Sequence, residues 1–178
     1  MKLDMTYYRL RFLRNFFQLL LLGVIVPGAL PSGQAASESA TVSANIVVAI
    51  TLANRNGMVF GDIAAGNTAG TVVLDPGGSR QTTGGAKINS TVASVPAVFD
   101  VEGLSNANYS ITLPDAVTLS GPGGDNMVVD SFTSFPQGTG LTDISGQQSL
   151  FVGATLNVDG NQTFGSYTGT MSVTIEYN

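Results

Sequence analysis

The sequence contains no cysteine, no histidine and no tryptophan among its 178 residues. The missing histidine and cysteine exclude Ser-His-Asp and Cys-His catalysis, together with the usual ligand sets for zinc and copper. Paired carboxylates would still allow a hydrolase, but the acidic residues lie mostly in predicted turns and at polar strand positions. We therefore predict a non-enzymatic protein without a cofactor. Because it lacks disulfides, an exported domain of this kind depends on its hydrophobic core or on a contribution from another chain.

Charged residues are also scarce, at 11% of the chain, and four of the seven basic residues fall within the first 15 positions. This basic stretch is followed by the apolar run "FFQLLLLGVIV" (Phe16–Val26) and by the small-residue stretch "GQAAS". The three-part layout predicts a secretory signal over residues 1–35, cleaved after Ala35. An uncleaved anchor is the alternative, but the apolar run is shorter than the ~20 residues that span a membrane. The mature protein is expected in the periplasm, on the outer surface or outside the cell.

Positive charge is almost absent from the predicted mature chain, residues 36–178. Three basic residues, Arg55, Arg80 and Lys87, stand against eleven acidic residues, which gives a net charge of −8. Nucleic acids are excluded as partners because neutralising phosphates requires clustered lysine and arginine. Anionic membrane surfaces repel such a domain, and we do not expect it to be embedded in a membrane.

The mature chain is rich in β-forming patterns. Apolar and polar residues alternate in short runs separated by glycine, proline and asparagine, and no stretch shows a helical period. This spacing predicts an all-β, immunoglobulin-like (pilin-like) sandwich of about eight strands in a single domain, with a barrel less favoured. The predicted strands are Thr41–Leu52, Met58–Ile63, Thr71–Asp75, Ala97–Gly103, Asn108–Pro114, Asn126–Phe135, Ser149–Val158 and Tyr167–Tyr177.

Two glycine-containing stretches in the C-terminal half of the chain have side-chain oxygen atoms of the kind that bind calcium. "GPGGDN" (Gly121–Asn126) and "NVDGNQ" (Asn157–Gln162) look like fragments of calcium loops, but neither supplies the ligand number that an EF-hand loop requires. Both are interpreted as turns, and we predict no metal site. Asp159-Gly160 in particular predicts a hairpin that leads into the final strand.

Apolar and polar residues alternate regularly at both ends of the predicted mature chain. The first 17 residues, Ala36–Leu52, contain no proline, no glycine and a single charge, whereas free termini are usually polar. This segment is either the first strand of its own sandwich or, in its first half, a strand that pairs with another molecule. Its apolar face carries the donor-strand candidates Val42, Ala44, Ile46 and Val48. The closing strand carries Tyr167, Met171, Val173, Ile175 and Tyr177 on one face.

Several stretches in a fixed order resemble a known bacterial family. They are "MVFGDI", "PAVFDVEG", "NYSITLP", "MVVDSF", "LFVGATLNV" and the closing "GSYTGTMSVTIEYN". From about Ala40 to Tyr177 the chain resembles the domain of unknown function 4402, and it is similar in layout to spore coat protein U domains and to subunits of archaic chaperone–usher pili. It departs from the coat proteins by lacking their usual cysteine pair, and its N-terminal extension is short.

The resemblance to pilins implies an immunoglobulin-like fold that lacks its last strand. A periplasmic chaperone first fills the resulting groove, and the N-terminal strand of the next subunit then replaces it. On this chain the resemblance implies that residues 42–48 are the donor and that the groove lies beside Met171, Val173 and Ile175. It also implies a tyrosine next to the last residue, which Tyr177 matches.

Two functions follow as hypotheses. The first is an exported structural subunit, pilin-like or part of a surface assembly, that associates by β-strand addition. Its partners would be copies of itself, a periplasmic chaperone and an outer-membrane usher. The alternative is a self-complete, monomeric sandwich in the periplasm or at the cell surface that binds a partner or a glycan.

Overall fold

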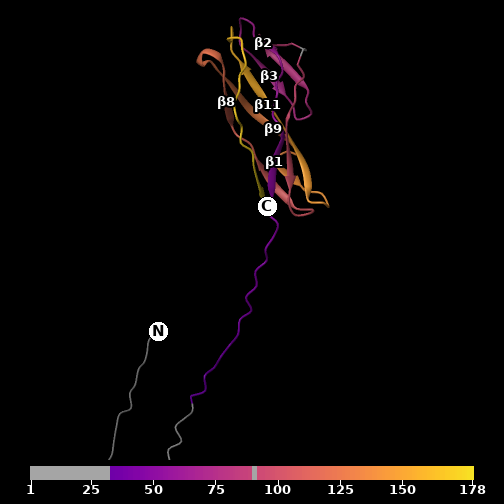
Figure 1. The fold of residues 1–178 in the computed structure, drawn as a ribbon, viewed down its shortest axis with the longest axis vertical. Coiled ribbons are helices and arrows are strands. Elements are labelled where there is room, and N and C mark those ends of the chain that lie inside the picture. The colour runs from indigo at the N-terminus through magenta and orange to yellow at the C-terminus, as the bar shows by residue number, and fades with distance from the viewer. Residues whose placement is uncertain (1–32, 90–91) are drawn as a thin grey trace, which may run out of the picture. The chain divides into compact units, whose positions relative to one another are not determined.

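The computed structural model describes residues 33–89 and 92–178, and their regular structure is almost entirely β. Residues 44–178 form one compact unit, and its antiparallel sheets confirm the predicted all-β sandwich (Figure 1). The predicted signal lies largely in residues 1–32, outside the described residues. The strands are β1 Thr51–Asn56, β2 Ile63–Ala64, β3 Gly70–Leu74, β4 Arg80–Gly84, β5 Lys87–Ile88, β6 Ala97–Glu102, β7 Asn108–Thr112, β8 Ala116–Ser120, β9 Asn126–Phe135, β10 Thr139–Leu141, β11 Gln147–Val158 and β12 Thr174–Tyr177, with a short 3₁₀ turn at Pro122–Gly124.

The largest sheet is built around β11, which is paired along both of its edges. One edge pairs with β9, and β9 pairs in turn with β8. The other edge pairs first with β6 and then, beyond Gly153, with β3. The sheet therefore divides at Gly153 into two arms, one formed by β6 and β1 and the other by β3 and β4. A side chain at this position would lie 2.2 Å from the Leu74 carbonyl oxygen, so only glycine fits where β3 turns away.

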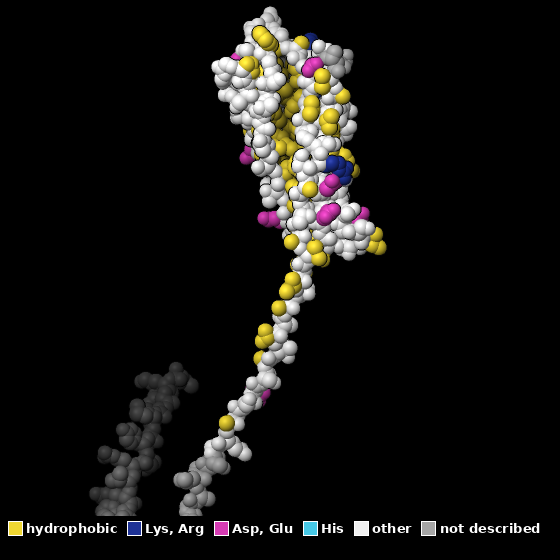
Figure 2. Space-filling model, in the orientation of Figure 1, with side chains coloured by type: hydrophobic (Ala, Val, Ile, Leu, Met, Phe, Trp, Pro, Cys, Tyr) yellow, Lys and Arg dark blue, Asp and Glu magenta, His cyan; other side chains and the backbone are white. Residues whose placement is uncertain are grey.

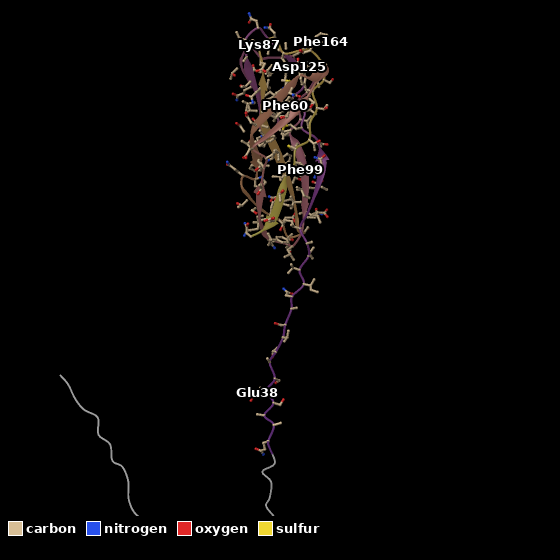
Figure 3. All side chains as sticks on the ribbon, turned by 90° about the vertical axis from the view of Figure 1, so that its left-hand side faces the viewer. Glu38, Phe60, Lys87, Phe99, Asp125 and Phe164 are labelled. Carbon is tan, nitrogen blue, oxygen red and sulfur yellow. The ribbon has the colours of Figure 1, made fainter. Side chains whose placement is uncertain are left out.

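A second sheet of three strands, in the order β10-β7-β12, lies opposite this branched sheet. The buried apolar side chains form two clusters, one made mostly by β3, β9 and β11 and the other by β6, β11 and Tyr109 of β7. Phe99 belongs to the cluster near the start of β11, and Phe60 packs against the other one, further along the domain (Figure 3). The largest side chains with almost no exposure are those of Val72, Leu74, Val101, Tyr109, Leu150 and Val152.

The predicted N-terminal strand, Thr41–Leu52, is wrong in extent. Strand β1 begins only at Thr51, and every residue from 33 to 49 is exposed and outside any strand. Alternation made the segment suited to a strand, but a strand also needs a neighbouring edge. The structure provides no such neighbour for these residues within the part of the chain that it describes.

The predicted hairpin at Asp159-Gly160 is also wrong. The two residues do lie in a turn, where the Gln162 N–H donates to the Asp159 carbonyl oxygen at 3.3 Å. The chain then crosses over, and β12 pairs with β7 instead of β11. The reason is that β3 and β9 already occupy both edges of β11 at this end, so no edge is free for a returning strand. The final strand is also shorter than predicted, because regular pairing starts at Thr174.

Candidate functional site

Two strand edges face each other without a partner strand in the described residues. Strand β1 ends its arm of the large sheet and pairs with β6 alone. Strand β12 ends the three-stranded sheet and pairs with β7 alone. Each free edge presents a row of backbone N–H and C=O groups that can pair with another strand.

The space between these two edges is a hydrophobic groove. Figure 2 shows hydrophobic side chains at the base of a hollow that runs along the domain between the C-terminal segment and the side that carries β1. Apolar residues of the domain pack against the buried clusters but remain half-exposed. They include Ile50, Leu52, Met58, Phe60, Ile111, Leu113, Phe132, Met171, Val173 and Ile175.

The C-terminal segment forms one side of the groove. Its predicted inward residues are all half-buried, and the residues between them are exposed. Thr168 makes a single bridge to Ser120, and residues 169–173 then have no strand pairing until β12 begins. The half-buried residues are Tyr167, Met171, Val173, Ile175 and Tyr177. The structure therefore places all five on one face of the segment, as the alternation predicts.

Tyr177 fixes the end of β12 to the corner between β6 and β7. Its hydroxyl oxygen accepts a hydrogen bond from the Leu104 N–H at 2.6 Å. A side chain on Gly103 would lie 2.2 Å from the same oxygen and 3.5 Å from an Ile50 side-chain carbon. Ile50, Gly103 and Tyr177 therefore meet at one end of the groove, where β1 begins and β12 ends.

Arg80 holds the segment after β1 that carries Phe60. Its guanidinium donates to the Phe60 carbonyl oxygen at 2.5 Å and to the Val92 carbonyl oxygen at 3.3 Å. Gly61, at φ +77°, leaves room for this group, since a side chain there would lie 2.4 Å from the guanidinium nitrogen. Sequence reasoning missed this contact, because nothing in the pattern around Arg80 indicates its partners.

The four donor-strand candidates are exposed. Val42 and Ile46 are 93% and 96% exposed, and Val48 is 60% exposed. Ala44 is also exposed. The structure therefore leaves the apolar side chains of this segment in solvent.

Other polar features of the described residues have structural explanations. The two stretches that resemble calcium loops contain turns, and the hydroxyl of Thr163, the residue after the second stretch, donates to the Asp125 carboxylate in the first. Arg55 pairs with Asp100 on the exposed face of the sheet. Residues 33–89 and 92–178 hold no group of three histidine, cysteine or acidic side chains placed to bind a metal. No helix in the described part is long and apolar enough to cross a membrane.

Comparison with known proteins gives one match. Neither the curated proteins nor the solved structures gave a match to the chain. A family model described as "Domain of unknown function (DUF4402)" matches residues 50–177. The match begins at Ile50, so the exposed segment before β1 lies outside it, whereas the groove lies within it. Since the match covers most of the sequence, the chain belongs to the DUF4402 family.

Proposed function

We propose that this protein is an exported, non-enzymatic structural subunit that associates by β-strand addition. The groove between β1 and β12 receives residues 42–48 of another copy, here called the donor segment. One observation carries the proposal: the same chain presents an open apolar groove with two free strand edges and an exposed segment with the alternation of a strand.

The donor segment and the groove match in length and chemistry. Residues 42–48 span about 20 Å when extended at ~3.3 Å per residue, and residues 171–177 along the groove span the same length. Backbone groups of an inserted strand would pair with the free edge, and its alternate side chains would enter the apolar base. The side chains that enter would be Val42, Ala44, Ile46 and Val48.

The sequence of the segment favours insertion into a different copy. To lie in its own groove, the segment would have to reverse direction just before Thr51. Tight reversals use glycine, asparagine or aspartate, and the residues leading into β1, "IVVAI" (Ile46–Ile50), contain none. The segment is therefore suited to continue straight from β1 into a neighbour.

Export and assembly partners complete the proposal. The predicted signal over residues 1–35 would direct the chain out of the cytoplasm. A free strand edge beside an apolar groove promotes aggregation, so a periplasmic chaperone would cover the groove before assembly. An outer-membrane usher would then order the subunits into a fibre or surface layer.

The test compares residues 36–178 with a form that lacks residues 36–46. The longer form should associate in a concentration-dependent way in sedimentation velocity, and the shorter form should stay soluble only with an added peptide of residues 36–48. A matched peptide with Val42→Asp and Ile46→Asp should not bind. A longer form that stays monomeric at high concentration, with the amides of Val42 and Ile46 protected from hydrogen exchange, would establish the self-complete sandwich instead.

A second candidate function rests on a different surface. A hollow of about 500 Å³ on the large sheet is lined by Pro76, Gly77, Pro96, Phe135 and Phe151. Phe135 is 68% exposed and stands opposite Phe151 across the β9–β11 pair. An apolar, aromatic hollow suits the face of a sugar ring or a peptide side chain. If the protein is a glycan-binding monomer, Phe135→Ala should abolish binding on a glycan array and leave thermal unfolding unchanged.

A further inference from the structure

We infer that the turn Asp143–Gly146 makes a second contact between successive copies. Ile144 would pack against the neighbouring copy whose groove receives the donor segment. This inference rests on the proposed strand addition, and it concerns a surface outside the groove. The partner is a second copy of this chain.

The short connection between donor segment and β1 forces the two domains together. Only Ala49 and Ile50 separate Val48 from Thr51. At about 3.3–3.6 Å per residue, the three steps between Val48 and Thr51 cover roughly 11 Å at most. When Val48 is held in the groove of a neighbour, the end of the domain where β1 begins must therefore abut that neighbour.

The turn Asp143–Gly146 lies at this same end. The Gly103 N–H donates to the Gly146 carbonyl oxygen at 2.8 Å, and Gly103 is the residue beside Ile50 and Tyr177. Ile144, in the turn, is 84% exposed, and Leu141 just before it is 52% exposed. Isolated exposed apolar residues are common, but these two lie where the connection requires contact with a neighbour.

The turn is also rigid, which lowers the entropy lost when a partner binds. The Asp143 carboxylate accepts hydrogen bonds from the backbone N–H groups of Ser145 and Gln147 at 2.8 and 2.9 Å. The Gly146 N–H donates to the Asp143 carbonyl oxygen at 3.0 Å. Gly146 adopts a φ of 78°, which closes the turn and leaves Ile144 projecting into solvent.

The test uses two matched substitutions of exposed β-branched residues in residues 36–178. Ile144→Thr should weaken association roughly tenfold in sedimentation velocity, the loss expected when one aliphatic side chain leaves an interface. Val73→Thr, on the exposed face of β3 at 40% exposure, should leave association unchanged. Ile144→Val should keep most of the affinity.

The outcomes separate this inference from the proposed function. If the parent chain associates and Ile144→Thr associates equally well, the second contact is refuted and strand addition stands. If the parent chain does not associate at all, both fail. With the peptide of residues 36–48 added to keep it soluble, the form that lacks residues 36–46 should unfold at the same temperature with and without Ile144→Thr. A lower unfolding temperature in the variant would assign Ile144 to folding and refute the contact.

Discussion

Gly153 is the residue on which the branching of the large sheet depends. It is buried in β11, and a side chain there would lie 2.2 Å from the Leu74 carbonyl oxygen and 2.7 Å from the Asp75 carbonyl carbon. Because backbone atoms must shift, Gly153→Ala should lower the free energy of unfolding by about 1–3 kcal/mol, as overpacking does. Gly57→Ala is the control, since Gly57 is exposed and no described atom lies within 4 Å of an added side chain. Equal denaturant midpoints for the two variants would show that the fold does not require glycine at position 153.

Tyr109 makes the stability of the folded domain depend on pH in the alkaline range. Its side chain is fully buried, and desolvation raises its pKa above the ordinary value of 10.0. The unfolded chain therefore loses this proton first as the pH rises, so the contribution of Tyr109 to stability is complete below about pH 10 and declines above it. Tyr109→Phe should flatten the fall in unfolding temperature between about pH 9 and pH 11. An unchanged slope in that range would show that other groups cause it.

The same substitution also removes a hydrogen bond, so its effect at neutral pH has to be measured separately. The Tyr109 hydroxyl donates to the Gln148 side-chain oxygen at 2.7 Å. Its loss should cost about 1 kcal/mol near pH 7, where the ionisation of Tyr109 has no influence.

At the scale of the strands, alternation predicts those whose inward faces are strongly apolar. The predicted segments for β3, β6, β7, β9 and β11 agree with the structure to within about two residues. Strand β4, "RQTTG", was missed because it contains no apolar residue, and its formation depends on pairing with β3. Strand β8, "AVTLS", was also missed, and it forms by pairing with β9.

Local pattern also predicts which side of a strand faces inward, but not which edge it joins. The prediction of which residues of the closing segment face inward agrees with the structure, whereas the prediction that this segment pairs with β11 was wrong. Both edges of β11 are occupied by strands that lie 20 to 90 residues away in the sequence. For the same reason the site contacts of Tyr177 with Leu104 and of Arg80 with Phe60 could not be read from the sequence.

Filling the groove within one chain should stabilise the domain. Residues 40–48 can be appended after Asn178 through a glycine-rich turn, which places the added strand antiparallel to β12 along its free edge. Occupation of the groove should raise the unfolding temperature, as any ligand that binds only the folded state does, and should keep the protein monomeric. The same extension with Val42→Asp and Ile46→Asp in the appended copy is the control. Identical unfolding temperatures for the two forms would show that the groove does not accept this strand.

At the scale of the whole molecule, the proposed assembly gives each copy one donor segment and one groove. These are two different surfaces, so the proposed contact between copies would be heterologous, and a chain of such contacts would extend until a copy lacks a donor or a groove. Residues 42–48 contain no charged residue, and the half-exposed residues named for the groove are all apolar. Association should therefore depend on burying apolar side chains and pairing backbone groups, with little sensitivity to salt.

Directed cross-linking tests the strand exchange between copies most directly, because the natural chain has no cysteine. One form of residues 36–178 carries Ile46→Cys, and three others carry Met171→Cys, Val173→Cys or Ile175→Cys. A disulfide requires the two Cβ atoms to approach to about 3.5–4.5 Å. Mixing the first form with each of the others under mild oxidation should give a cross-linked pair with at least one of them, and Val73→Cys should give none. Strand exchange is contradicted if no mixture cross-links while a single chain carrying both cysteines forms an internal disulfide at high dilution.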